Sequence, residues 1–256
     1  MKKTSTNGFL ILILSIGFTY GCPCSLHAQS TENSNWLKKG DIQLKKGNYA
    51  EAIKDYNEEI KLHPKVPGAY ARRGFVFFNQ DDFAKAILDF NKAIELNPKK
   101  SDYFYKRGNS YVHNRLDLDH AIPDFSRGIE LNPKDPWNYY GLGFAYSVKR
   151  DFNKAISNLT KAIELKPDFG EAYNNRGETY SAMKDYDKAI LDFTKAIQYG
   201  ICCGPQGAYD NRGLCYENKG DIDRAISDFK TAIKSNPKDD FAKLYLKQAL
   251  SEKNKR

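Results

Sequence analysis

The residues best able to carry chemistry are few, namely five cysteines and four histidines. Cys202, Cys203 and Cys215 lie in the body of the chain. They could form one disulfide, Cys203–Cys215 or Cys202–Cys215, or all three could stay as small apolar fillers. No histidine lies near them, and their spacing fits no zinc pattern. We therefore expect no metal site.

The histidines also lack the partners that catalysis requires. His27, His63, His113 and His120 have no repeated or clustered neighbour. We expect His113 to be a surface residue, and the alternative is that it faces the groove. The sequence holds no Gly-rich phosphate loop, no His-Glu-x-x-His and no Gly-x-Ser-x-Gly motif. We therefore predict that the protein is not an enzyme and uses no cofactor.

The composition is that of a soluble, ordered protein. Apolar residues make up 41% and charged residues 28%, and the formal net charge is +8. The charges are interspersed along the chain, as on solvated helices. Nucleic-acid binding would require a continuous basic stripe, which the sequence lacks. We expect no nucleic-acid partner.

The first 28 residues resemble a secretory signal peptide. Lys2 and Lys3 precede an apolar run, FLILILSIGF at residues 9–18, which is short for a membrane span. Cleavage after Ala28 would leave a short linker, residues 29–32. Two alternatives stay open, a lipoprotein signal with lipidation at Cys22 and a retained anchor helix.

The leader predicts export. The mature protein would be periplasmic or secreted, in the style of a bacterial envelope protein, with lipid anchoring at Cys22 as the alternative. Contact with a membrane is expected only through that possible anchor.

The body of the chain is periodic. The repeated unit must therefore determine where all the residues discussed above lie. A glycine, an Ala-Ile pair and a proline each recur along the chain with the same period. The glycines are spaced by 34 to 36 residues and are Gly40, Gly74, Gly108, Gly143, Gly177 and Gly213. Such a period is typical of a stack of small supersecondary units.

Each unit is predicted to hold two helices. In residues 67–100, Tyr70, Gly74 and Phe77 share one helix face, and a second apolar stripe of the same period follows from Phe83. Residues 79–82, Asn-Gln-Asp-Asp, supply a turn with candidate N-caps. Asn97-Pro98 ends the second helix, because the residue before proline disfavours helical dihedrals.

The recurring glycine requires a packing explanation. A glycine inside a helix costs about 1 kcal/mol relative to alanine, so something must offset this cost at each repeat. We predict close approach of the second helix, with its recurring alanine opposite the glycine. Arg73, Arg107, Arg176 and Arg212 share another repeat position, and we expect them to pair with acids such as Asp89, Glu95, Asp192 and Asp228.

The motif Tyr173-x-x-x-Gly177-x-x-Tyr180, followed by Ala189, Phe193 and Ala196, resembles the tetratricopeptide repeat. The resemblance implies an all-α fold, a right-handed α-solenoid of about six helix pairs with a C-terminal capping helix at residues 240–256. The six predicted repeats span residues 33–239, as 33–66, 67–100, 101–135, 136–169, 170–205 and 206–239.

Three repeats depart from the pattern. Repeat 1 has Gln43 and Glu59 where an aromatic residue and an alanine are expected, which suggests a degenerate cap. Repeat 3 has one extra residue, and Pro123 is expected to kink its second helix. Repeat 5 has two extra residues within 200–205.

The family resemblance also implies a binding site, because first helices of tetratricopeptide repeats line an inner groove. The groove positions are aromatic in the middle repeats and acidic towards the C-terminus. The predicted groove residues are Phe75, Phe78, Tyr105, Asn109, Trp137, Tyr140, Phe144, Glu171, Asn174, Glu178, Asp210 and Glu217.

Aromatic side chains make good anchors for a partner because they give large contact area with few rotatable bonds. We therefore predict a protein or peptide partner with apolar residues followed by basic ones. The protein would act as an interaction scaffold or adaptor in the cell envelope. The alternative is a non-catalytic accessory or regulatory subunit of an envelope enzyme or secretion complex.

Overall fold

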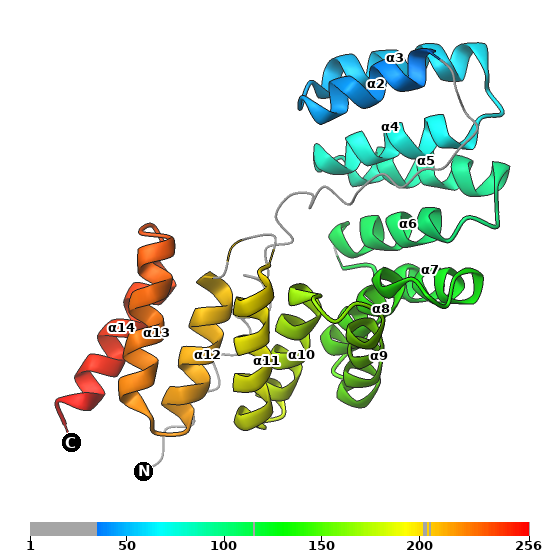
Figure 1. Cartoon of the computed structure of the whole chain (residues 1–256). Helices are drawn as coiled ribbons and strands as arrows, with labels where there is room; N and C mark the ends of the chain where they lie inside the picture. The colour runs from blue at the N-terminus through cyan, green and yellow to red at the C-terminus, as the bar shows by residue number, and fades with distance from the viewer. Residues whose placement is uncertain (1–34, 115, 202–203, 205, 256) are drawn as a thin grey trace. The chain divides into compact units, whose positions relative to one another are not determined.

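The computed structural model of the protein describes residues 35–114, 116–201, 204 and 206–255. Every regular element in these ranges is a helix (Figure 1). The first helices of the repeats are α2 (Asn35–Lys45), α4 (Pro67–Asn79), α6 (Ser101–His113), α8 (Pro136–Val148), α10 (Gly170–Ala182) and α12 (Gln206–Asn218). The second helices are α3 (Tyr49–Leu62), α5 (Phe83–Leu96), α7 (Leu118–Leu131), α9 (Phe152–Leu165), α11 (Tyr186–Tyr199) and α13 (Ile222–Ser235). The last helix is α14 (Asp240–Lys253).

The predicted all-α fold of about six helix pairs with a C-terminal helix is confirmed by this order of elements. Each predicted repeat range contains one first helix and one second helix. The predicted leader, its cleavage site and Cys22 lie outside the described residues. Among the helices that the structure describes, none combines the length and apolar character needed to cross a bilayer.

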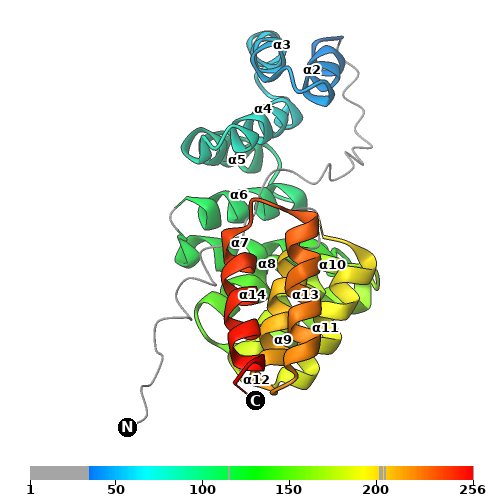
Figure 2. The ribbon, with the colours of Figure 1, turned by 90° about the vertical axis from the view of Figure 1, so that its left-hand side faces the viewer.

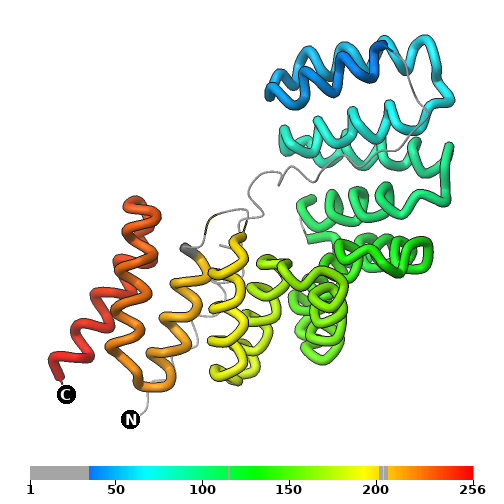
Figure 3. The backbone as a smooth tube through the Cα atoms, in the orientation of Figure 1, coloured from blue at the N-terminus to red at the C-terminus, as the bar shows by residue number. Residues whose placement is uncertain are grey.

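The helices group into two compact units, and the division falls inside α8. The N-terminal unit takes the described residues up to Ala145 and the C-terminal unit those from Tyr146. In the N-terminal unit α2 packs on α3, α4 on α5 and α6 on α7 (Figure 3). In the C-terminal unit α10 packs on α11 and α12 on α13, and α14 lies beside α13 (Figure 2).

One repeated aspartate starts the second helices. Its carboxylate accepts a hydrogen bond from the backbone N–H three residues further on, which satisfies a donor that the helix leaves open. The capping residues of α5, α7, α9, α11 and α13 are Asp82, Asp117, Asp151, Asp185 and Asp221. The N-cap predicted within residues 79–82 is therefore confirmed at Asp82.

Each turn between the paired helices contains one residue with positive φ. Glycine fills this position in repeats 1 and 6, as Gly47 and Gly220. The other four repeats use Asp81, Leu116, Arg150 and Lys184, with φ between 56° and 65°. A non-glycine residue in this left-handed region costs about 1–2 kcal/mol, so these turns are strained.

The recurring glycine lets an aromatic ring of the second helix approach the first helix. A Cβ added at Gly177 would lie 2.9 Å from Cε1 of Phe193, and one at Gly213 would lie 2.6 Å from Cε1 of Phe229. Gly108 and Phe125 repeat this contact. Close approach was predicted, but the alanine was the wrong counterpart, since the phenyl ring occupies the space above the glycine.

The repeated arginines form the expected ion pairs. Arg176 Nε and Nη2 donate to Asp192 Oδ2 and Oδ1, each at 2.8 Å. Its Nη1 donates to Thr160 of the preceding repeat at 2.9 Å. The same arrangement joins Arg73 to Asp89 and Asn57, Arg107 to Asp124 and Asn91, and Arg212 to Asp228 and Thr194. Each arginine therefore connects three helices.

The irregular repeats keep the architecture. The helix α7 runs without interruption through Pro123 and has the same 14 residues as its counterparts. In repeat 1, the carboxylate of Glu59 is buried and lies 3.0 Å from His63 Nδ1. Gln43 accepts a hydrogen bond from Asn48 in the following turn. The unusual residues of repeat 1 thus make polar contacts of their own.

We predict that Gly177→Ala lowers the free energy of unfolding by about 1–2 kcal/mol, because overpacking against Phe193 outweighs the better helix propensity of alanine. Gly207 is the matched control, since its added Cβ would meet nothing within 4 Å. Gly207→Ala should leave stability unchanged or raise it. Urea unfolding measures both variants, and equal effects would contradict the packing role of the glycine.

We further predict that Asp192→Ala lowers the free energy of unfolding by about 3 kcal/mol, because it leaves the Arg176 guanidinium without its counter-ion in a largely buried position. The double variant Arg176→Met, Asp192→Leu should recover most of this loss. Glu164→Ala, which removes the exposed pair with Lys161, should change stability by less than about 1 kcal/mol. A double variant as unstable as Asp192→Ala would contradict the pairing argument.

Candidate binding surface

First helices of neighbouring repeats touch one another directly, which makes their outward residues one surface within each unit. In the N-terminal unit α2 contacts α4, and α4 contacts α6. In the C-terminal unit α10 contacts α12, and α12 contacts α14. We call these two surfaces the N-terminal face and the C-terminal face. The predicted groove residues of α4, α6, α10 and α12 belong to these faces, and Trp137 of α8 (Pro136–Val148) adjoins the N-terminal face through its ring contact with Tyr105.

The N-terminal face carries aromatic rings that are partly exposed. Phe75, Phe78, Tyr105 and Trp137 are each between buried and fully exposed. Lys106 Nζ lies 5.4 Å from the Phe75 ring centre, so the ring already holds a cation over its face. The Tyr105 and Trp137 rings lie 5.9 Å apart. Asn109 is also partly exposed, on the same helix as Tyr105.

Two of the predicted aromatic anchors lie inside the protein. The exposed fractions of Tyr140 and Phe144 are 5% and 6%. These rings therefore offer little area to a partner. They belong to a longer buried segment of α8, in which every residue from Tyr140 to Ala145 is buried.

His113, which we expected on the surface or in the groove, is partly buried. Its ring stacks on Phe83 and meets Phe78 edge-on, with ring centres 5.2 Å apart in both pairs. Burial lowers the pKa of His113 because the charged imidazolium loses its hydration. The side chain therefore helps to pack the end of the N-terminal face.

Several acids lie on the C-terminal face. Among them, Glu178 accepts hydrogen bonds from two asparagine side chains. Its Oε1 accepts hydrogen bonds from Asn174 Nδ2 at 2.8 Å and from Asn211 Nδ2 at 3.1 Å. Burial raises the pKa of Glu178 to about 7, although these two amides oppose the shift. The predicted residues Asn174 and Glu178 therefore belong to one hydrogen-bonded group.

Asn211 is a member of this group that the sequence did not indicate. It lies one repeat after Glu178, and the hydrogen bond joins α10 to α12. The period itself was the available signal, because residues separated by about one repeat face each other across neighbouring first helices.

The remaining predicted acids differ in their surroundings. Glu171 lies in the first turn of α10 and is partly buried. Burial raises the pKa of Asp210 to about 7, and the charges of Asp239 and Asp228 add to the shift. Burial, together with the charge of Glu252, also raises the pKa of Glu217. Acids in this state favour a neutral form or a bound cation.

Cys215 is fully buried and its thiol is free. It packs with Ala189 and Phe193, and its Sγ lies 3.6 Å from Ser181 Oγ. Burial raises the pKa of this thiol to about 11, so it stays protonated near neutral pH. Cys202 and Cys203, the predicted disulfide partners, lie outside the described residues.

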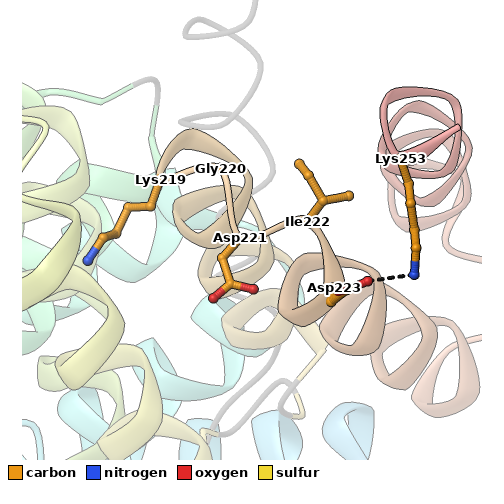
Figure 4. A pocket seen from close by; sticks show the side chains of 6 residues that line it. All are labelled: Lys219, Gly220, Asp221, Ile222, Asp223 and Lys253. Atoms are coloured by element: carbon orange, nitrogen blue, oxygen red, sulfur yellow. Dashed lines mark hydrogen bonds and ion pairs between the residues drawn. The ribbon is translucent and has the colours of Figure 1, made fainter. Parts of the chain in front are cut away.

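An open pocket lies away from both faces, at the turn between α12 and α13. Figure 4 shows its six lining residues, Lys219, Gly220, Asp221, Ile222, Asp223 and Lys253. Lys253 Nζ lies 2.6 Å from Asp223 Oδ1, which ties the end of α14 to α13. Asp221 caps α13 and pairs with Arg224. Because these charges already have partners, the pocket holds no candidate site. Within the described ranges no cluster of metal-binding side chains occurs.

Comparison with models of known protein families shows which family the chain belongs to. Models of the tetratricopeptide repeat match residues 67–100, 138–169, 170–199 and 207–239, and a model of the TPR repeat matches residues 40–81. Together these stretches cover more than half of the sequence. The chain belongs to the tetratricopeptide repeat family. The matches leave out residues 101–137, which include the irregular repeat with Pro123.

Solved structures share the fold of this tetratricopeptide protein. The APC/C hetero-tetramer Cut9–Hcn1 aligns with a TM-score of 0.75 at 21% identity, over 84% of this chain and 42% of that chain. This chain thus spans less than half the length of that relative. PilW, a widely conserved type IV pilus biogenesis factor, gives a TM-score of 0.75 at 14% identity, over 82% of this chain and 96% of PilW.

YrrB, described as a TPR protein with an unusual peptide-binding site, gives a TM-score of 0.57 at 21% identity. The alignment covers 75% of this chain and 97% of YrrB. No curated protein matches the sequence. At these identities the solved structures show the fold alone, while the repeat family supports a protein–protein interaction scaffold.

We predict that Glu178→Gln raises stability at pH 8 relative to the unchanged protein and that the difference vanishes near pH 4. The folded-state pKa of about 7 exceeds the ordinary value of 4.5, so the folded protein holds this proton more tightly. Glu178 therefore reduces stability increasingly as pH rises from about 4.5 to 7. The gain should be on the order of 1–2 kcal/mol.

Urea unfolding of both proteins between pH 4 and pH 8 measures this difference. Glu95→Gln is the control, since Glu95 forms an exposed pair with Lys92 on α5. A difference for Glu178→Gln that is independent of pH would contradict the raised pKa.

Proposed function

We propose that this tetratricopeptide protein is a non-catalytic scaffold of the cell envelope that binds a peptide or protein segment on its first-helix faces. The observation that carries the proposal is the pair of faces itself, one with partly exposed aromatic rings and one with desolvated acids. Aromatic rings supply contact area, and a cluster of acids attracts basic groups.

The preferred segment has apolar residues followed by basic ones. On the N-terminal face Phe75, Phe78, Tyr105 and Trp137 would bind apolar residues of a partner, and on the C-terminal face the acids would bind basic residues. Buried Tyr140 and Phe144 take no direct part in this proposal. The peptide-binding site attributed to YrrB supports a peptide ligand for the fold but does not define its sequence.

The envelope location rests on the sequence alone. Lys2, Lys3 and the apolar run at residues 9–18 support export. Mass spectrometry of the mature N-terminus distinguishes the two forms of this proposal. A chain that starts at Gln29 would be periplasmic or secreted, and a lipidated N-terminal Cys22 would be a lipoprotein.

A peptide-display selection against the purified protein tests the ligand preference. We expect enrichment of peptides in which apolar residues precede basic ones. Phe75→Ala should weaken the binding of a selected peptide about tenfold, as for an aromatic anchor. No enrichment, or enrichment of acidic peptides, would contradict the proposal.

Leu88→Ala is the matched control. Leu88 is 68% exposed, but it lies on the second helix α5. This variant should change affinity less than twofold, because the side chain lies outside the first-helix face. Equal losses for the two variants would place the ligand elsewhere on the protein.

A further inference from the structure

Three aromatic rings meet where α4, α5 and α6 pack together in the N-terminal unit. His113 stacks on Phe83, with ring centres 5.2 Å apart and an angle of 29° between the ring planes. Phe78 meets His113 edge-on at 5.2 Å and Phe83 edge-on at 5.4 Å. Each ring therefore contacts the other two. We call these three side chains the ring cluster.

The ring cluster is built from helix ends. Phe78 lies in the last turn of α4, Phe83 is the first residue of α5, and His113 is the last residue of α6. In the turn between α4 and α5, the Asp81 N–H donates to the Phe78 carbonyl at 3.0 Å. The two phenyl rings thus come from repeat 2, and His113 joins them from repeat 3.

The ring cluster includes one of the anchors on the N-terminal face. All three of its side chains are partly exposed, so it lies at the edge of this face and not in the core. Phe78 touches Phe83 on the neighbouring helix and His113 on the next first helix. An anchor that is already held by its neighbours loses less conformational entropy when a ligand binds. The contacts of Phe78 therefore favour binding.

The charge of His113 affects the stability of the ring cluster. A neutral imidazole packs on phenyl rings as another aromatic ring does. Burial lowers the pKa of His113, because an imidazolium loses hydration here, and the charge of Asp81 opposes this shift without cancelling it. From α4 and α5 the imidazole faces the rings of Phe78 and Phe83, and Asp81 lies in the turn that joins these helices.

Acid therefore favours a state in which His113 has left the ring cluster. A solvated imidazole has the ordinary pKa of 6.5, and the packed imidazole has a lower pKa. The solvated state consequently binds a proton more tightly than the packed state does. The stabilisation from packing is fully present above about pH 6.5 and decreases as the pH falls below this value.

We propose that His113 positions the Phe78 anchor and thereby makes the binding of an apolar partner segment to the N-terminal face weaker in acid. The neutral imidazole holds the Phe78 ring, and protonation removes one of the two ring contacts that this anchor has. The inference rests on the proposed scaffold function and adds a regulation of its N-terminal face. His113 acts through Phe78 and is a positioning residue.

Calorimetric titration of the full chain with the apolar part of a display-selected peptide tests this regulation. The probe is blocked at both ends and contains no charged residue and no histidine, so neither its own titration nor the acids of the C-terminal face affect its binding. We expect its affinity to be about three- to tenfold lower at pH 5 than at pH 7.5. Equal affinities at the two pH values would overturn the proposal.

Two variants separate the charge of His113 from its packing. His113→Phe keeps an aromatic ring in the cluster and cannot be protonated, so it should bind the probe equally well at pH 7.5 and pH 5. His113→Ala removes the ring, and it should weaken binding severalfold at both pH values. If His113→Phe loses affinity in acid as the unchanged protein does, another group is responsible and the assignment is wrong.

His120→Phe is the matched control. His120 also stacks on an aromatic ring, that of Tyr111 at 5.0 Å, but its side chain is 66% exposed and its Nδ1 lies 2.8 Å from Asp117 Oδ2. It belongs to the second helix α7, outside the N-terminal face. This variant should keep the acid sensitivity of the unchanged protein. Loss of the acid sensitivity in this control would contradict the assignment to His113.

NMR spectroscopy of the unchanged full chain follows the ring cluster without any ligand. The imidazole of His113 should titrate with a midpoint below pH 6.5, and its cross-relaxation with the rings of Phe78 and Phe83 should weaken as it becomes protonated. A protonated His113 that keeps these ring contacts in full would overturn the proposal.

Failure of this inference and failure of the scaffold function give different results. If peptides bind but His113→Phe leaves the pH profile unchanged, the role of His113 is wrong and the scaffold function stands. If NMR shows that the ring cluster opens in acid but no peptide binds at any pH, the scaffold function is wrong and only the acid-sensitive packing of Phe78 stands.

Discussion

The contact between a glycine on one helix and an aromatic ring on its partner determines the geometry of each regular repeat. At Gly177 and Gly213 the space of the absent side chain is filled by Phe193 and Phe229. A ring in this position fixes both the distance and the rotation of the two helices. The glycine side of each first helix is thereby committed to the core, and its other side remains for the next repeat or a ligand.

The four repeated arginines, Arg73, Arg107, Arg176 and Arg212, connect neighbouring repeats. Each of the four arginines binds an aspartate in its own repeat and a side chain in the preceding one. In repeat 4 the equivalent position is Leu142, which is buried, and Asn158 replaces the aspartate. These two side chains cannot form the ion pair that four of the other repeats contain.

Much of the fold was predictable because its determinants are local and repeated. The spacing of the glycines and alanines predicted the helix pairs, and the turn residues 79–82 predicted an N-cap, which Asp82 supplies. The aromatic partner of Gly177 was missed, because spacing alone shows which residues share a face but not which of them meet.

The candidate site was less predictable, since it depends on how neighbouring repeats meet. Helical spacing placed Tyr140 and Glu178 on equal terms, yet Tyr140 is buried and Glu178 binds Asn211 of the next repeat. The contacts of His113 with the rings of Phe78 and Phe83 could not be predicted either, because spacing alone does not show which side chains meet. Nor could the sequence show that Asp210 is buried and that its Oδ1 has no hydrogen-bond partner among the described residues.

The strained turns have a consequence for how this protein tolerates change. Leu116, Arg150 and Lys184 occupy backbone conformations that suit glycine, and all three lie in turns between paired helices, outside the helices that carry the two faces. Substitutions at these turn residues can therefore change stability without changing a residue of either face. An engineer could strengthen the scaffold at its turns and leave its ligand preference as it is.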